Sequence, residues 1–110
     1  MKKFAVFVAP AANDRMADHF EFLSRVSENA ANKLLDELMK DIKSLETTPE
    51  INPYLYRPYL EQKKYRYKLS NKRYRIVYQI IKDTVYVDDF QDCRQDDDKS
   101  LLKNISSCVG

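Results

Sequence analysis

Hydrophobic and polar residues alternate along the start and the second half of the chain, and recur with a helical period in between. The alternation over 3–9, which Pro10 ends, predicts a buried strand. Alternation returns after residue 63 and predicts three further strands, at about 64–69, 73–81 and 84–90. The short polar stretches between these three strands are typical of tight turns.

The helical period predicts two helices between the first strand and Pro49. The first helix is expected to begin at a cap on Asn13 or Asp14 and to run to about Val26, and Ser27 offers a cap for the second. Their apolar stripes consist of Met16, Phe20 and Leu23 in the first helix and of Ala31, Leu34, Leu35, Leu38, Ile42 and Leu45 in the second. Because the link is so short, we expect an antiparallel helical hairpin.

The order of elements is β-α-α-β-β-β, which predicts an α+β fold. A helical hairpin would pack on one face of a small, mostly antiparallel sheet, whose last three strands form an antiparallel meander. The 110 residues suffice for one domain, 1–110, with one core. The stretch 52–60, with two prolines and three tyrosines, predicts an extended loop, and 99–110 a short helix or a flexible tail.

Composition removes several classes of function. The only glycine is Gly110, which excludes P-loops and dinucleotide-binding turns. Cys93 and Cys108 form no CxxC pair and cannot build a usual zinc site with His19, so we expect neither a metal nor a cofactor. The first thirteen residues, MKKFAVFVAPAAN, resemble a very short signal peptide, but their alternation favours a strand. No segment is long and apolar enough to span a membrane, so no membrane partner is expected.

A block of positive charge lies between Lys63 and Lys82, which contains no Asp or Glu. Its cations are Lys63, Lys64, Arg66, Lys68, Lys72, Arg73, Arg75 and Lys82. They alternate with tyrosines and aliphatic residues at the period of a strand, which directs them to one face of a sheet. Gathered cations repel one another unless an anion joins them, so a polyanion such as RNA is the first partner to consider. The other interpretation is a solvated face of an exposed hairpin, which charge runs usually are.

The length of the turn after the first of these strands decides whether the cations meet. A two-residue turn at Ser70-Asn71 pairs Arg66 with Arg75, and a four-residue turn pairs Lys68 with Arg75. A turn with an odd number of residues would scatter them over the two faces.

All eight tyrosines fall between Tyr54 and Tyr86, within or beside the basic block. We expect the strand tyrosines Tyr65, Tyr67, Tyr74 and Tyr78 to pack under the helices. The loop tyrosines Tyr54, Tyr56 and Tyr59 are the better candidates for stacking on bases.

The segments YRYKLSNKRYRIVYQI at 65–80 and DTVYVDDFQDCRQD at 83–96 resemble the RelE/ParE superfamily of toxins from bacterial type II toxin–antitoxin systems, and the helices resemble it more loosely. The resemblance implies a cytoplasmic toxin neutralised by a cognate antitoxin. RelE-like members are ribosome-dependent endoribonucleases that act on mRNA, whereas ParE-like members poison DNA gyrase. The hairpin is nearer to RelE-like members, so ribosome-bound mRNA is the expected target and DNA gyrase the alternative.

The resemblance also implies a cleavage site at Arg66, Lys68 and Arg75 on the hairpin and at Arg94 after the last strand. RNA cleavage without metal requires the ribose 2′-OH to attack the adjacent phosphate while charge builds on the phosphate oxygens. Arginines suit the phosphate, whereas Lys68 can lose a proton and is assigned to proton transfer. The neighbouring cations Lys63, Lys64, Lys72 and Arg73 are expected to bind RNA.

The tail after Arg94, QDDDKSLLKNISSCVG, departs from the RelE-like pattern. It lacks the tyrosine found there, and Asp96, Asp97 and Asp98 would weaken attraction to RNA. Two alternatives therefore stay open: a ParE-like gyrase inhibitor without nuclease activity, and a degenerate toxin that only binds its antitoxin.

Overall fold

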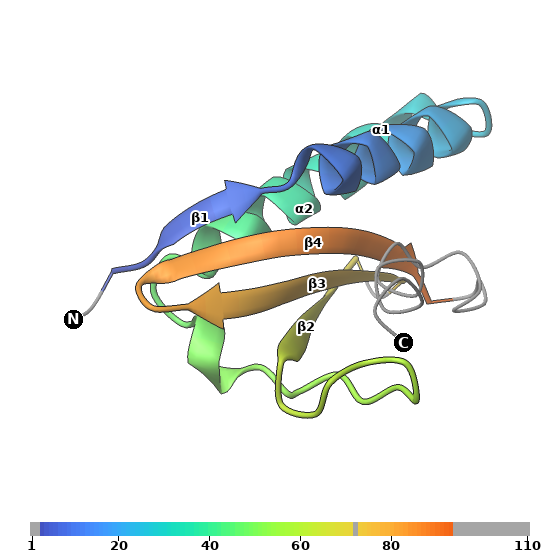
Figure 1. The fold of residues 1–110 in the computed structure, drawn as a ribbon. Coiled ribbons are helices and arrows are strands. Elements are labelled where there is room, and N and C mark those ends of the chain that lie inside the picture. The colour runs from blue at the N-terminus through green and yellow to red at the C-terminus, as the bar shows by residue number, and fades with distance from the viewer. Residues whose placement is uncertain (1–2, 72, 94–110) are drawn as a thin grey trace.

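The α+β fold and its order of elements are confirmed in a computed structural model that describes residues 3–71 and 73–93 (Figure 1). The elements are β1 (Ala5–Val8), α1 (Pro10–Ser24), α2 (Glu28–Ser44), a 3-10 helix (Pro49–Ile51), β2 (Tyr65–Ser70), β3 (Tyr74–Ile81) and β4 (Thr84–Asp92). The sheet order is β1-β4-β3-β2. The strands β2, β3 and β4 form the expected antiparallel meander, and β1 lies parallel to β4, which makes the sheet mixed.

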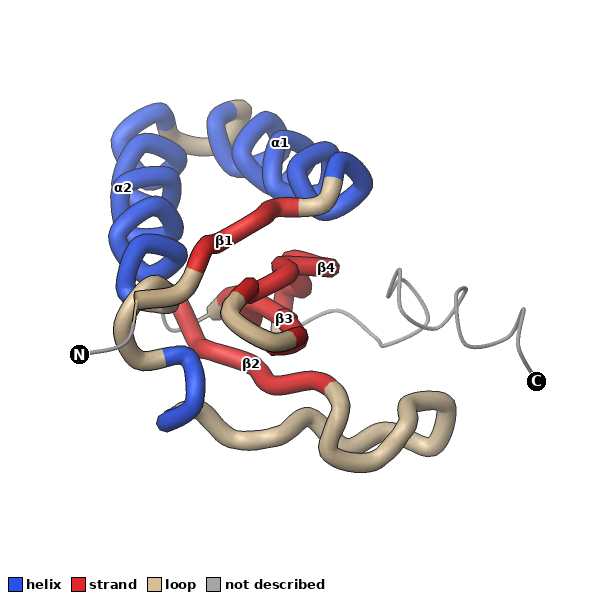
Figure 2. The backbone as a smooth tube through the Cα atoms, turned by 60° about the vertical axis from the view of Figure 1, so that its left-hand side comes forward, coloured by secondary structure: helices blue, strands red, loops and turns tan. Residues whose placement is uncertain are grey.

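Both helices cover one face of the sheet, as Figure 2 shows. The core between them contains Leu34 and Leu38 of α2, Ile76 of β3 and Val85 and Val87 of β4, all of them buried. Each fully buried aliphatic side chain of this kind contributes about 1.5–3 kcal/mol. The N-terminal stretch contributes Phe4 to the same core, and β1 is paired along its length with β4, so its interpretation as a strand is confirmed.

The loop after the 3-10 helix covers part of the opposite face. Leu55 and Leu60 of this loop pack on Tyr65 and Val77, with Tyr67 beside them. The expectation that Tyr65 and Tyr67 lie under the helices is therefore wrong. They point away from the helices because neighbouring residues of a strand point to opposite faces, and the loop supplies their apolar cover. The same expectation is confirmed for Tyr74 and Tyr78, which are buried in the helix-side core.

The two helices begin differently. The predicted cap of α1 at Asn13 or Asp14 is wrong, because α1 begins at Pro10 directly after β1 and no side chain caps it. Proline suits the first turn of a helix, since it has no N–H that would be left unsatisfied there. The predicted cap of α2 is confirmed: Ser27 Oγ accepts a hydrogen bond from the N–H of Ala30, at 3.2 Å.

Helix α1 lies beside the part of β4 that extends beyond β1. His19 Nε2 donates to the carbonyl oxygen of Phe90 at 2.9 Å, and Arg15 Nε lies 3.9 Å from Oδ1 of the buried Asp89. The hydrogen bond gives His19 a structural role, because it joins α1 to β4. Within the described residues, neither helix combines the length and the apolar character that crossing a bilayer requires.

Candidate functional site

The turn between β2 and β3 separates the cations that the sequence places on these strands. Ser70 pairs with Tyr74, so three residues, 71–73, lie between the strands, and Asn71 takes a left-handed conformation with φ 53°. An odd turn is the case that scatters the cations. Residues directly opposite in an antiparallel pair share a face. Lys68 is opposite Ile76, which is in the helix-side core, whereas Arg75 is opposite Leu69 and points to the other face.

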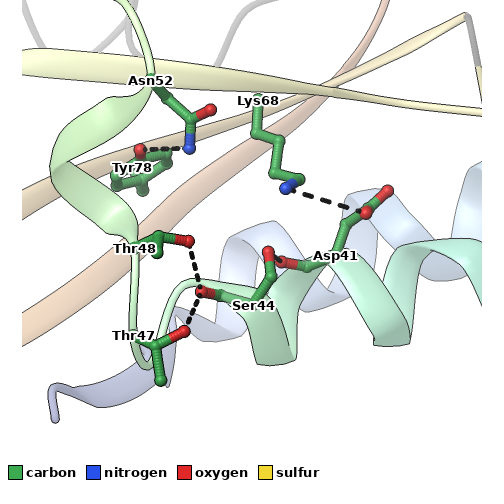
Figure 3. A network of polar contacts seen from close by, with 7 residues as sticks. All are labelled: Asp41, Ser44, Thr47, Thr48, Asn52, Lys68 and Tyr78. Atoms are coloured by element: carbon green, nitrogen blue, oxygen red, sulfur yellow. Dashed lines mark hydrogen bonds and ion pairs between the residues drawn. The ribbon is translucent and has the colours of Figure 1, made fainter. Parts of the chain in front are cut away.

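Lys68 points from β2 toward helix α2, as Figure 3 shows. Its Nζ lies 3.9 Å from Oδ1 of Asp41, and both side chains are about three-quarters buried, with 23% and 24% of their surfaces exposed. The lysine assigned to proton transfer therefore has a carboxylate as its partner and is remote from the face that carries Arg75.

Arg66 holds the segment that follows α2. Its Nη1 donates to the carbonyl oxygens of Glu50 and Asn52, at 3.1 and 2.6 Å, and its Nη2 donates to the hydroxyl of Tyr54 at 2.9 Å. The guanidinium also stacks 4.0 Å above the centre of the Tyr54 ring. These contacts position the loop, and they engage three of the five N–H donors of Arg66.

Tyr78, directly opposite Arg66 on β3, fastens the same segment. Its hydroxyl donates to the carbonyl oxygen of Pro49. It also accepts a hydrogen bond from Nδ2 of Asn52 at 2.9 Å, as Figure 3 shows. Burial raises the pKa of Tyr78, against the opposing effects of the Asn52 hydrogen bond and the Arg66 charge. The phenol therefore keeps its proton and serves as a donor.

Of the other predicted residues that the structure describes, Lys63 and Lys64 precede β2 and Arg73 lies beyond its other end. Lys63 and Lys64 line a small pocket of about 220 Å³ together with Arg66, and Lys64 Nζ lies 3.9 Å from Oε2 of Glu61. Arg73, at the end of the β2–β3 turn, donates from Nε and Nη2 to Oδ2 of Asp92, at 3.0 and 2.8 Å. This hydrogen bonding raises the pKa of Arg73. Lys72 and Arg94 lie outside the described residues, as does the stretch 99–110.

Arg75 lies on the face that the helices leave uncovered, in a pocket of about 360 Å³ that we call the Arg75 pocket. It is lined by Tyr54, Leu55, Tyr56, Arg57, Tyr67, Leu69, Arg75 and Cys93. The Arg75 guanidinium lies 5.9 Å from the centre of the Tyr67 ring, and Cys93 is an exposed free thiol. Two guanidinium groups beside three tyrosine rings suit an anionic or flat polar group.

Sequence reasoning missed Arg57 and Cys93 as parts of this pocket. The sequence could have indicated Arg57, because it lies among Tyr54, Tyr56 and Tyr59, the loop tyrosines that are candidates for stacking on bases. Nothing in the local sequence marks Cys93, because its position depends on where β4 ends beside the loop.

A β-α-α-β-β-β chain with a helical hairpin on one face of this sheet is a RelE/ParE-type toxin fold. The family model described as the ParE toxin of the type II toxin–antitoxin system parDE matches residues 6–97. The chain belongs to this family of toxins. A solved chain of the chromosomal ParDE toxin–antitoxin system from P. aeruginosa is similar in fold, with a TM-score of 0.65 and 10% sequence identity, over 82% of this chain and 96% of that one. No curated protein matches the sequence.

Proposed function

We propose that this chain is the toxin of a toxin–antitoxin pair and that it arrests growth by binding a protein target, DNA gyrase, without cleaving RNA. The observation that carries this proposal is the three-residue turn, which places Lys68 and Arg75 on opposite faces of the sheet. Membership of the ParE family supports the same direction, and a cognate antitoxin is the partner that such a toxin requires.

Cleavage of RNA without metal requires a proton acceptor and phosphate-binding groups around one phosphate. Lys68 is paired with Asp41, and three of the N–H donors of Arg66 bond to the loop backbone and to Tyr54. To join Arg75, the side chains of Lys68 and Arg66 would have to point to the other face of the sheet. This requires a one-residue shift of the β2–β3 register, which would move every side chain of β2 to the opposite face. The arrangement therefore favours a binding protein over a nuclease.

The second candidate is the ribosome-dependent mRNA endonuclease, and the Arg75 pocket is the observation in its favour. Its tyrosine rings suit a base, and Arg57 and Arg75 suit a phosphate. A nuclease built on this pocket would depend on Arg75 and not on Lys68, so the two residues separate the candidates.

The test is induced expression of the wild type, Lys68→Ala and Arg75→Ala in growing cells, with Lys33→Ala as a matched control on the exposed side of α2. We expect arrest to persist with Lys68→Ala, to be relieved by the antitoxin, and to come with broken chromosomal DNA and inhibited supercoiling by purified gyrase. Primer extension on a translated message should show no new cuts. Cuts that need translation would contradict the proposal: their loss with Arg75→Ala alone would establish the second candidate, and their loss with Lys68→Ala would restore the nuclease site that the sequence suggested.

A further inference from the structure

Arg75 differs from the other described cations of the β2–β3 hairpin in that its guanidinium has no polar partner. Arg66, Lys68 and Arg73 each bond to or pair with another group of the protein. Within the described part of the chain, the Arg75 side chain forms neither a hydrogen bond nor an ion pair, and it lies only beside the ring of Tyr67. A guanidinium with its N–H donors available can bind a carboxylate through two parallel hydrogen bonds.

The loop that lines the Arg75 pocket is fixed to the sheet. The N–H of Leu55 donates to the carbonyl oxygen of Tyr65 at 2.7 Å, and the N–H of Tyr67 donates to that of Pro53 at 3.1 Å. The loop thus pairs with the edge of β2. Tyr54, in the same loop, is held by the hydrogen bond and the stacking described above. A pocket with a wall held in this way loses little conformational entropy when a partner binds.

Apolar side chains accompany the guanidinium in this pocket. Leu69, directly opposite Arg75 on β2, and Tyr56 of the loop are each 56% exposed. Arg57 adds positive charge, and its Nη1 donates to the carbonyl oxygen of Tyr56 at 2.7 Å. None of the described residues that line the pocket is acidic. Arginine and tyrosine beside exposed apolar groups are the composition of a protein-binding hot spot, here with a preference for an acidic partner.

The positions of the other cations favour a protein over a nucleic acid as the occupant. A single strand of nucleic acid is held by a basic groove that follows its backbone over several nucleotides. Lys68 and Arg66 lie instead on the helix side of the sheet, and the charge of Arg73 is balanced by Asp92. The pocket therefore offers a local site for an anion in apolar surroundings, which suits the carboxylate of a protein side chain.

We propose that the toxin binds gyrase through the Arg75 pocket, and that the pocket takes an Asp or Glu side chain of gyrase whose neighbours are apolar. The carboxylate accepts two hydrogen bonds from Arg75, and the apolar neighbours cover Leu69 and Tyr56. This inference rests on the proposed function for the identity of the partner and deepens it by assigning the surface that binds. The guanidinium supplies specificity, and the covered apolar side chains supply affinity.

The test measures binding of purified gyrase to the full toxin chain. Growth arrest is not the readout, because a nuclease built on this pocket would also lose it with Arg75→Ala. We expect Arg75→Ala to weaken gyrase binding about thirtyfold, because the partner carboxylate loses its charged donors. Arg75→Lys should restore only part of the affinity, since an ammonium group cannot form two parallel hydrogen bonds.

The apolar part of the pocket is tested by Leu69→Asp, which places a negative charge beside the expected carboxylate and should weaken binding about thirtyfold as well. Two substitutions provide matched controls. Ile81→Asp changes a similarly exposed aliphatic residue at the other end of β3, and Arg25→Ala changes an exposed arginine of α1. Neither should change the affinity by more than about twofold.

Cys93 provides a measurement on the unaltered toxin. Its thiol is free and exposed and lines the pocket, so iodoacetamide should modify it in the free toxin. We expect this modification to be lost when gyrase is in excess, as followed by mass spectrometry of the peptide that contains Cys93. This result does not depend on the folding of any variant.

Equal gyrase binding by the wild type and Arg75→Ala, or full modification of Cys93 in the complex, would overturn the inference and leave the action on gyrase intact. Failure of the wild type to bind gyrase would refute both. Binding of a single-stranded RNA oligonucleotide that is lost with Arg75→Ala would also overturn the inference, because the occupant would then be a nucleic acid.

Discussion

The ammonium nitrogen of Lys68 lies 3.9 Å from Asp41 Oδ1, so the lysine that resembles a catalytic residue joins the sheet to helix α2. We expect Lys68→Met to leave growth arrest unchanged and to lower the free energy of unfolding by about 1 kcal/mol or less, since ion pairs with partial access to water contribute little. Urea unfolding of Lys68→Met, Asp41→Asn and the double variant measures the coupling. Loss of toxicity in a folded Lys68→Met protein would show that this lysine acts on the target.

Arg66 is expected to matter for stability more than for chemistry. Arg66→Ala removes a charged donor from two carbonyl oxygens and one hydroxyl, and we expect it to lower the free energy of unfolding by about 2–3 kcal/mol. Exchange of the Leu55 amide, which bonds the loop to β2, should become faster. Arg25→Ala, which breaks an exposed pair with Glu21 on α1, is the control and should be nearly neutral. An equal effect of the two substitutions would show that Arg66 does not anchor the loop.

Asp92 anchors the end of the sheet through Arg73. Asp92 is buried, and its Oδ2 accepts two hydrogen bonds from the partly exposed guanidinium. We expect Asp92→Asn to destabilise the protein by about 1–3 kcal/mol, because the guanidinium loses a charged acceptor. Thermal and urea unfolding beside Asp36→Asn, an exposed change on α2, provide the measurement. A loss no larger than that of Asp36→Asn would count against this anchor.

The pH dependence of stability should carry a contribution from Asp88, at the irregular pairing between β3 and β4. Burial raises its pKa, against the opposing effects of the Gln79 hydrogen bond and the Lys64 charge. A raised pKa means that the folded state holds the proton more tightly than the unfolded chain. The protonated carboxyl therefore stabilises the fold fully below the unfolded pKa of about 3.9, and this stability is lost as the pH rises through the folded pKa.

In the wild type, Gln79 Nε2 donates to Asp88 Oδ2 at 2.6 Å. Asp88→Asn keeps an oxygen that can accept this hydrogen bond and removes the negative charge. We expect the substitution to raise the free energy of unfolding near neutral pH, with the gain disappearing below about pH 3.9. Urea unfolding across this range is the measurement, with Asp36→Asn as the control. A gain that is the same at all pH values would assign the effect to packing.

Local signals in the sequence were sufficient for most elements of the fold. The cap at Ser27 depends on a hydrogen bond three residues away, and the strands follow from alternation, so both could be predicted. The start of α1 was missed because Pro10 ends a strand and also begins a helix. The parallel pairing of β1 with β4 joins residues about eighty positions apart, which local patterns do not determine.

The site was harder to predict because it depends on one turn. No glycine fixes the type of turn after Ser70, so lengths of two, three and four residues were all compatible with the sequence. The three-residue turn is stable here because side chains on both faces of β2 have partners. Lys68 forms an ion pair with Asp41 on one face, and Tyr65 packs on Leu55 and Leu60 on the other. That cover comes from α2 and from the loop, whose positions the strand sequence does not contain.

The loop that covers β2 also limits how such chains can assemble. Growth of a fibre by strand pairing needs two unpaired sheet edges on every molecule, one for each of its two neighbours. The contacts of Leu55 and Tyr67 close one side, so an association through β1 ends with the first partner. The fold thus favours complexes of fixed composition and protects the free toxin from polymerising when its partner is absent.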